Sequence, residues 1–415
     1  MSGHRRMAAW QVGVVFTAFA FNYFIAALLR AVVATLAPEF ARELQLGAGE
    51  LGLLAGAYFL GFACMQLPIG WLLDRYGARQ VLLGLLTMAV LGCVGFAMAR
   101  SFGQLVLARL SIGVGVSASL IAPLTAFMRL VDRPLQLRLN AWMLMSGSMG
   151  MVASTLPVQA MLPALGWRNL FLFLAAALVA AWVLIAAVAP RDRTPGPQAR
   201  QPVGGYGRIV RHPVFVRSAP LAYFSYGGLI AVQSLWAGPW LTHVTNADAV
   251  GAAQGLFLIN LSMLASFMTW GLVMPRLVAR GIDAELLLAW GWPLGALALL
   301  LIISAGSEAG APWLAAWCVC TSVVTLSQPT VAQAFEKAEA GRALSAFNLL
   351  IFLGVFSCQW GMGLAIDALM VAGWSSGDSH RAAMALLLLG TIGAGAWHWA
   401  HPKIIERKRT IAARG

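Results

Sequence analysis

Twelve long apolar stretches dominate this sequence of 415 residues and limit its fold more than any other feature. A helix needs roughly 20 apolar residues to cross the hydrocarbon core of a bilayer, and each stretch is about that long. Only 10% of the residues are Asp, Glu, Lys or Arg, whereas a soluble domain carries about 25%, so a soluble protein could not cover its surface. The sequence therefore predicts an all-α membrane protein with twelve transmembrane helices, at about 10–36, 49–73, 79–99, 102–130, 138–163, 168–189, 217–244, 251–279, 284–305, 311–335, 342–371 and 380–401.

The connections between these stretches are short, with one exception. Residues 190–216 are rich in Pro, Gly and Arg, a composition typical of an exposed linker. This linker separates six helices from six. We therefore expect an N-terminal six-helix bundle (1–189), a cytoplasmic linker (190–216), a C-terminal six-helix bundle (217–401) and a basic cytoplasmic tail (402–415). The first apolar run is too long for the core of a signal peptide, so no cleavable signal is expected.

The positions of the basic residues predict the orientation of the chain in the membrane. If the N-terminus is cytoplasmic, 22 of the 28 Lys and Arg residues fall in segments on the inner side and four fall on the outer side. Cytoplasmic loops of membrane proteins carry such an excess. Both termini are therefore expected in the cytoplasm. The net charge of +13 then reflects topology, so no nucleic-acid partner is expected.

The cysteines and histidines do not suggest a metal site, a disulfide framework or an enzyme. All five cysteines fall in predicted membrane helices, and the six histidines form no cluster of ligands. No metal-binding His-Glu motif, phosphate-binding loop or serine elbow stands in an aqueous loop, and the loops are too short for a catalytic domain. We therefore expect a protein without cofactor or metal that is not an enzyme.

Two inner loops at equivalent positions in the two halves resemble each other. The loop after the second helix reads GWLLDRYGARQ (70–80), and the loop after the eighth reads GLVMPRLVARG (271–281). The first loop matches G-x-x-x-D-R-x-G-x-R, the signature of the major facilitator superfamily of secondary transporters, and the fourth helix resembles the R-x-x-x-G-x-G signature of that family. The matching residues are Gly70, Asp74, Arg75, Gly77 and Arg79 in the loop, and Arg109, Gly113 and Gly115 in the helix.

The resemblance extends to the organisation of the whole chain and implies transport by alternating access around a central cavity between two pseudo-symmetric bundles. It also implies that the loop signature helps to close the cytoplasmic side. Asp74 would need a partner for its charge if it is buried, and Arg129 at the inner end of helix 4 is the expected partner. Alternatively, Arg75 and Arg79 only anchor the topology. The expected gating residues are Gly70, Asp74, Arg75, Gly77, Arg79 and Arg129.

Arg30 and Arg109 are the two basic residues that loop topology does not explain. They lie in the outward halves of helices 1 and 4, where an unpaired charge is costly and marks a functional candidate. Asn22 and Tyr23 share a helix face with Arg30. In the fold that the resemblance implies, helices 1 and 4 line the cavity, and two guanidiniums there would suit a carboxylate or a phosphate. Alternatively, Arg30 reaches the outer headgroups, and Arg109 bonds to neighbouring backbone carbonyls.

Helix 1 also resembles the organic-anion and organophosphate branches of the superfamily, in which the segment N-Y-x-R-x7-P is typical. Asn22-Tyr23 and the interval from Arg30 to Pro38 match it, while the interval from Asn22 to Arg30 is longer. Those branches use this arginine for an anionic substrate, and some members add a helix-7 arginine or nearby carboxylates that carry a coupling proton. Here helices 1 and 4 hold no Asp or Glu, and helix 7 has no Arg or Lys after Arg217.

Other polar residues within the helices are further candidates. A Tyr/Gln stripe along one face of helix 7 suits a cavity for a polar solute or, alternatively, joins neighbouring helices; it comprises Tyr223, Tyr226, Ile230 and Gln233. Gln328 is a similar candidate in helix 10. Asp367, near the outer end of helix 11, is the remaining membrane acid. It could titrate, pair with an arginine, or face the outer water.

These observations predict a secondary active transporter that moves a small organic anion, either a carboxylate or a phosphate ester, across a bacterial inner membrane. The alternative is proton-coupled efflux of drugs or hydrophobic compounds, a branch whose usual helix-5 glycine-proline pattern is absent here. The expected partners are the substrate, H+ or Na+ as a coupling ion, and the bilayer, and the protein is expected to be a monomer. The expected substrate-binding residues are Arg30, Arg109, Asn22, Tyr23, Tyr223, Tyr226, Gln233 and Gln328, with Asp367 as the candidate for coupling.

Overall fold

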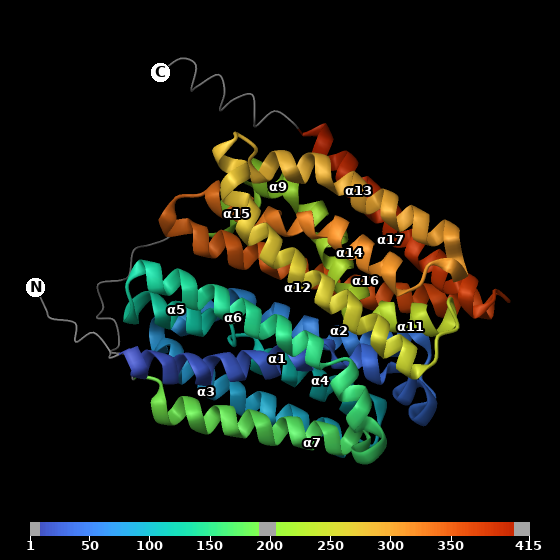
Figure 1. Cartoon of the computed structure of the whole chain (residues 1–415), viewed down its shortest axis with the longest axis horizontal. Coiled ribbons are helices and arrows are strands. Elements are labelled where there is room, and N and C mark those ends of the chain that lie inside the picture. Colours follow the sequence, from blue (N-terminus) through green and yellow to red (C-terminus); the bar gives the residue numbers. More distant parts are fainter. Residues whose placement is uncertain (1–8, 191–204, 402–415) are drawn as a thin grey trace, which may run out of the picture. The chain divides into compact units, whose positions relative to one another are not determined.

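The computed structural model describes residues 9–190 and 205–401, apart from the side chains of Ala9, Arg129, Lys337 and Ala338 (Figure 1). The described residues form helices and no strands. Nine helices in this part of the chain are long and apolar enough to cross a membrane. These findings confirm the predicted all-α membrane fold. The predicted basic tail and most of the predicted linker lie outside the described residues.

The chain separates into two compact units. The first contains Met1–Glu39 and Ala57–Gln201, and the second contains Phe40–Gly56 and Pro202–Gly415. The helices of the N-terminal half are α1 (Ala9–Leu44), α2 (Ala48–Cys64), α3 (Gln66–Met98), α4 (Phe102–Val116), α5 (Ile121–Leu130), α6 (Arg133–Ala153) and α7 (Leu156–Val188). In the first unit, α3 packs against both α4 and α7.

Two glycines turn the chain inside α3 and α7. Gly77 has a φ of +79° and Gly166 has a φ of +67°, a backbone conformation that strains a residue with a Cβ atom. Each glycine separates a short first segment from a long second one. α3 therefore combines the end of predicted helix 2 with predicted helix 3, and α7 combines the end of predicted helix 5 with predicted helix 6.

The second unit contains the remaining helices, and two of its membrane segments are irregular. The segment predicted as helix 7 consists of α9 (Pro213–Pro220), the π-helix η2 (Leu221–Tyr226), α10 (Gly227–Ala231), the π-helix η3 (Val232–Trp236) and α11 (Ala237–His243). The segment predicted as helix 10 consists of α14 (Ala311–Thr321), the 3-10 helix η5 (Ser322–Leu326) and α15 (Ser327–Gln333). The other helices are α8 (Tyr206–Val210), α12 (Ala249–Ala279), α13 (Ala284–Ala305), the 3-10 helix η4 (Gly306–Glu308), α16 (Lys337–Val371) and α17 (Ser376–Ala400).

Three of the twelve predicted membrane helices are not among the nine long apolar helices. They are the segments 49–73, 138–163 and 217–244. α2 is only 17 residues long before a break at Met65, α6 ends at Ala153, and predicted helix 7 is divided into five short elements. The total of twelve therefore stays a prediction.

The exposed surface of α7 is apolar. Five large apolar side chains along it are between 43% and 54% exposed: Leu172, Phe173, Val179, Val183 and Leu184. A continuous apolar surface of this kind is an aggregation liability in water. In a bilayer it faces lipid tails of the same polarity, as the composition predicts.

Candidate functional site

Tyr58 of α2 links the two intramembrane arginines of the first unit. Its hydroxyl hydrogen-bonds with the side chain of Arg30 and lies 3.4 Å from the carbonyl oxygen of Ala26. The guanidinium of Arg109 lies over the ring of Tyr58, 5.0 Å from its centroid. Cations are attracted to the face of an aromatic ring at this distance. The fold therefore brings Arg30 and Arg109 to the same tyrosine.

Arg109 is fully enclosed in the first unit, with 0% of its surface exposed. Its Nη1 donates a hydrogen bond to the carbonyl oxygen of Leu29 at 3.0 Å. A hydrogen bond to a neighbouring carbonyl was the alternative role expected for Arg109, and Nη1 has this role. Nε and Nη2 are also buried and have no hydrogen-bond partner among the described residues. A buried guanidinium with unused donors is costly, so an anionic acceptor would stabilise it.

Arg30 is half-buried rather than fully exposed at the outer surface. Besides its hydrogen bond with Tyr58, its guanidinium lies 5.7 Å from the centroid of the Phe62 ring. Both contacts are to α2. They hold the guanidinium against the helix that also contacts Arg109.

Asn22 and Tyr23 lie in the interior of the first unit, as their spacing from Arg30 suggests. Asn22 is 0% exposed, and neither its Nδ2 nor its Oδ1 has a hydrogen-bond partner among the described residues. A buried amide without partners is unusual in a native protein. Tyr23 packs against α6, where Gly147 leaves room for its ring: a Cβ atom at Gly147 would lie 2.3 Å from Cε1 of Tyr23.

Tyr58 is the residue of this site that sequence reasoning missed. The available signal was a phenol within the apolar stretch 51–64. Its significance depends on the position of α2 beside α4, and this position depends on glycines. A Cβ atom at Gly113 would lie 2.0 Å from the carbonyl oxygen of Tyr58, and one at Gly61 would lie 2.2 Å from that of Leu110. Gly113 of the helix-4 signature therefore allows α4 to approach α2 closely enough for Arg109 to reach Tyr58.

Gly113→Ala is expected to destabilise the protein, because the new methyl group would force α2 away from α4. Overpacking of this kind typically costs about 1–3 kcal/mol. Thermal unfolding of the purified protein in detergent measures the effect. Gly95→Ala is the matched control, since a Cβ atom there meets nothing closer than 3.9 Å. Equal melting temperatures for the two variants would contradict this account.

The polar residues predicted in the second unit do not converge on one site. The Tyr223 hydroxyl donates to Oγ of Ser357 on α16 at 2.6 Å, whereas Nε2 of Gln233 donates to Oδ1 of Asn260 on α12 at 3.0 Å. Nε2 of Gln328 donates to Oδ1 of Asn348 at 2.5 Å. Each of these pairs joins two helices, which is the alternative role expected for the Tyr/Gln stripe.

The π-helices explain why the stripe is divided. The single face predicted for Tyr223, Tyr226, Ile230 and Gln233 assumed 3.6 residues per turn. Two stretches of this segment instead have the wider π-helical turn. Tyr223, Tyr226 and Ile230 are half-buried, and Gln233 is buried at 5% exposure. Tyr223 and Gln233 consequently contact two different helices.

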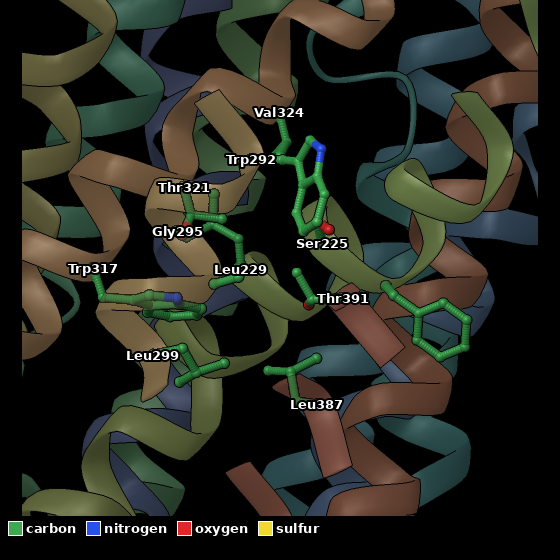
Figure 2. Close-up of a pocket in the computed structure, with 12 residues that line it drawn as sticks. Ser225, Leu229, Trp292, Gly295, Leu299, Trp317, Thr321, Val324, Leu387 and Thr391 are labelled. Carbon is green, nitrogen blue, oxygen red and sulfur yellow. The ribbon is translucent and has the colours of Figure 1, made fainter. Parts of the chain in front are cut away.

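A small cavity lies beside the first π-helix in the core of the second unit. Figure 2 shows Ser225, Trp292, Thr321 and Thr391 around it. Its volume is about 10 Å³, which accommodates roughly one water molecule. Oγ of Ser225 and Oγ1 of Thr321 have no hydrogen-bond partner among the described residues. The cavity is too small for an organic substrate.

The loop signature turns the backbone and contacts a neighbouring helix. Gly77 turns the chain between two helical segments, and Arg79 donates through Nη2 to the carbonyl oxygen of Ala186 on α7. A Cβ atom at Gly70 would meet nothing within 4 Å among the described residues, and Asp74 and Arg75 are exposed. The Arg75 guanidinium lies 5.3 Å from the Trp71 ring. Since the side chain of Arg129 lies outside the described residues, the ion pair with Asp74 stays a prediction.

Asp367 does not simply face the outer water, which was one of its expected environments. It is half-buried, and both oxygens of its carboxylate accept hydrogen bonds from backbone amides. Oδ1 accepts from Ala48 at 2.9 Å and Oδ2 accepts from Gly49 at 2.7 Å. The tertiary structure places the first turn of α2 over this carboxylate, a contact that no sequence spacing could indicate.

Comparison with curated proteins finds relatives that match part of the chain. The protein named "Putative multidrug resistance protein MdtD" from Salmonella newport (strain SL254) is 28% identical over 141 residues. The match covers 34% of this chain and 29% of that protein, and MdtD of Klebsiella pneumoniae subsp. pneumoniae matches to the same extent. The chain thus spans less than a third of the length of these relatives.

Solved structures match nearly the whole chain, at identities that show the fold alone. A bacterial homologue of the human lysosomal transporter Spinster has a TM-score of 0.73 at 17% identity, covering 95% of this chain and 98% of that one. A D-xylose-proton symporter has a TM-score of 0.73 at 14% identity, covering 92% and 97%. A POT family transporter in complex with 5-aminolevulinic acid has a TM-score of 0.75 at 12% identity, covering 94% and 96%.

The family model described as Major Facilitator Superfamily matches residues 19–358. This range contains both predicted signatures and most of the described helices. Together with the nine long apolar helices, it identifies a multi-pass integral membrane protein. Since the match covers well over half of the chain, this protein belongs to the Major Facilitator Superfamily of membrane transporters.

Proposed function

We propose that this transporter moves a small organic anion, a carboxylate or a phosphate ester, and that Arg30 and Arg109 bind its charge. The observation that carries the proposal is the environment of Arg109. This side chain is fully buried, and Nε and Nη2 have no hydrogen-bond partner among the described residues. A carboxylate or phosphate matches the planar fork of a guanidinium and accepts two parallel hydrogen bonds from it.

The surroundings of Arg109 favour an anion over a cation. Helices 1, 2 and 4 contain no Asp or Glu within 10–38, 51–73 and 102–131. A cationic substrate would have no carboxylate to pair with in these helices and would be repelled by two permanent cations. Asn22, with both amide atoms unused, adds one donor group and one acceptor for the polar part of an anion. Tyr58 orients Arg30 and presents its ring to Arg109.

The proposed mechanism is alternating access, in which two six-helix bundles, 1–189 and 217–401, expose the substrate site to one side of the membrane at a time. The charge distribution of the sequence supports cytoplasmic termini, and the bacterial origin of the MdtD relatives supports a bacterial inner membrane. Gly70, Asp74, Arg75, Gly77, Arg79 and Arg129 would stabilise closure of the cytoplasmic side. Within the second unit, Tyr223, Tyr226, Gln233 and Gln328 stay candidates for substrate contacts, and the side-chain pairs of Tyr223, Gln233 and Gln328 also join helices. The protein would act as a monomer, without catalytic activity, and would use H+ or Na+ if it is coupled to an ion.

Uptake into proteoliposomes tests the proposal with a panel of mono- and dicarboxylates and phosphate esters. At least one of these anions should be transported, and Arg30→Gln should abolish its transport. The proposal is wrong if no anion in the panel is transported, or if Arg30→Gln transports the anion as fast as the parent.

Tyr58→Phe should raise the KM for the transported anion roughly tenfold, the effect of losing a hydrogen bond to a charged group. The ring remains against Arg109, so the variant removes only the hydroxyl that bonds with Arg30. Tyr76→Phe is the matched control, because Tyr76 is 44% exposed in the inner loop. The account is wrong if the two variants have the same KM as the parent.

A second candidate function is efflux of drugs or hydrophobic compounds, which the name of the MdtD relatives favours. The aromatic environment of Arg30 and Arg109, formed by Phe62 and Tyr58, is compatible with an apolar substrate that carries a negative charge. A resistance profile distinguishes the two candidates. Overexpression would raise the tolerated concentration of toxic compounds for an efflux pump, and Arg109→Met would leave that resistance unchanged if the compounds are uncharged.

A further inference from the structure

Two histidines that are far apart in the sequence form a pair within the second unit. His243 is the last residue of α11, and His380 lies near the start of α17, 137 positions later. Their ring centroids lie 5.0 Å apart, and the ring planes are inclined by 28°. No spacing along the chain indicates this pair, so the sequence alone suggested no cluster of histidines.

A hydrogen bond fixes the tautomer of His380. Its Nδ1 lies 2.8 Å from the carbonyl oxygen of Ser376. Because a carbonyl oxygen only accepts hydrogen bonds, Nδ1 carries the proton of the neutral ring, and the lone pair is at Nε2. Histidines that bind metal ions generally donate their other ring N–H to a carbonyl or a carboxylate in this way. The ring of His380 is therefore prepared to act as a ligand through Nε2.

The separation of the two rings fits one metal ion between them. Zn2+ binds imidazole nitrogens at about 2.0–2.1 Å in a tetrahedral arrangement. Two imidazoles on one such ion have ring centroids roughly 5 Å apart, which matches the separation of His243 and His380. The pair therefore needs little movement to hold an ion through one nitrogen of each ring.

The surroundings hold His380 in place and leave His243 accessible. The ring of Trp236 packs against His380 at an angle of 69°, with centroids 6.1 Å apart, and His380 is 6% exposed. His243 is exposed, so an ion can reach the pair from the solvent. Gly377 lets α17 approach α11, since a Cβ atom there would lie 3.3 Å from the carbonyl oxygen of His243.

The cation closest to His380 in the sequence already has partners. Arg381 donates through Nη1 to Oδ1 of Asp378 at 3.2 Å and through Nε to the carbonyl oxygen of Ile303 at 3.1 Å. Within the described residues, no three His, Cys, Asp or Glu side chains form a group that could hold a metal ion. The pair would therefore supply two ligands and water the others, so it should bind a metal ion reversibly and more weakly than a closed site with four protein ligands.

We propose that His243 and His380 form a binding site for one divalent transition-metal ion of the class that prefers imidazole, which includes Zn2+, Ni2+ and Cu2+. The bound ion would join the end of α11 to the first turns of α17. The alternative role of the pair is an aromatic stack without affinity for metal. The inference uses none of the residues of the proposed anion site, so it does not depend on the proposed function.

Metal titration of the full chain, purified without a polyhistidine tag, tests the site. The background variant carries His4→Ala, Cys64→Ser and Cys320→Ser, which replace the histidine nearest the N-terminus and the two cysteines that are not buried. Isothermal titration calorimetry with Zn2+ should show one ion bound per chain. His243→Phe and His380→Phe should each weaken this binding at least about tenfold, the smallest loss that is typical even for an outer-shell partner of a metal ligand.

Phenylalanine keeps an aromatic ring at each position, so these variants separate metal binding from packing. Without metal, their melting temperatures should equal that of the background variant. Zn2+ should raise the melting temperature of the background variant, because an ion that binds only the folded state stabilises it, and it should not raise that of His380→Phe. His401→Phe is the matched control, since His401 is an exposed histidine that follows the other end of α17, and it should retain both the affinity and the shift.

Cu2+ provides a direct count of the ligands. Pulsed electron paramagnetic resonance of bound Cu2+ distinguishes one coordinating imidazole from two, and it should show two in the background variant and one in each single variant. The site is refuted if Zn2+ shows no saturable binding, or if it binds His380→Phe as tightly as the background variant. A spectrum with fewer than two imidazoles in the background variant would also refute it.

Discussion

Arg109→Met should reduce kcat/KM for the transported anion at least about 100-fold, and it should do so without destabilising the protein. Truncating one partner of a buried, hydrogen-bonded charge pair typically costs 2–5 kcal/mol of binding, and 2.7 kcal/mol corresponds to about 100-fold. Methionine has a similar length and fits the apolar space beside Tyr58. Initial rates of uptake into proteoliposomes over a range of anion concentrations measure the effect.

The stability of the same variant separates a substrate-binding role from a structural one. Arg109 is a buried cation that donates a hydrogen bond to the carbonyl oxygen of Leu29, and replacing a buried charge by an apolar side chain is often neutral or stabilising. The melting temperature of Arg109→Met without substrate should therefore equal or exceed that of the parent. Arg100→Met, at an exposed position, is the control for loss of a positive charge. A lower melting temperature combined with normal transport would assign Arg109 to structure alone.

Glu285→Gln should lower the free energy of unfolding by about 2 kcal/mol. Nη1 of Arg217 donates to Oε1 of Glu285, and its Nε donates to the carbonyl oxygen of His398 at 3.0 Å. The Arg217 side chain is 4% exposed and that of Glu285 is 25% exposed. Breaking a fully buried pair costs about 3–5 kcal/mol because the remaining charge has no counterpart, and the partial exposure of Glu285 reduces that value through solvent screening. Thermal unfolding in detergent should show the loss as a melting temperature lower by several degrees.

The double variant Arg217→Met/Glu285→Gln should recover part of this loss. It also removes the positive charge of Arg217, which has lost its partner. The double variant should therefore lower the free energy of unfolding by less than the sum of the two single variants. Glu308→Gln is the matched control, since Glu308 is exposed. An additive double variant, or a Glu308→Gln effect as large as that of Glu285→Gln, would mean that the ion pair does not contribute to stability.

Much of this protein could be predicted from the sequence because the relevant signals are local. Apolar stretches of about 20 residues predict membrane helices from length and composition alone, and the turns at Gly77 and Gly166 fall where the predicted helices end. Helical periodicity failed in predicted helix 7, where two π-helices change the direction of the side chains after Leu221. A π-helix depends on how a segment packs against its neighbours, so spacing within the segment does not reveal it.

The candidate site shows the same division between local and tertiary information. Arg30 and Arg109 could be selected from the sequence because charges are rare within membrane segments. Tyr58 could not, because its role depends on glycines that bring α2 beside α4. Asp367 was recognised as the remaining membrane acid, yet its partners are the Ala48 and Gly49 amides, and backbone amides carry no sequence identity.

The sequence by itself determined that the helices lie in a bilayer, which family the chain resembles and which two arginines lie within membrane helices. Hydropathy, the positions of charges and short signatures can be read along the chain without knowledge of its fold. Only the tertiary structure decided which residues meet: Tyr58 with Arg30 and Arg109, and Asp367 with the first turn of α2. The physical reason is that these contacts join residues between 28 and about 320 positions apart in the sequence. Their formation depends on close approach of helix backbones, which glycines permit and which packing alone brings about.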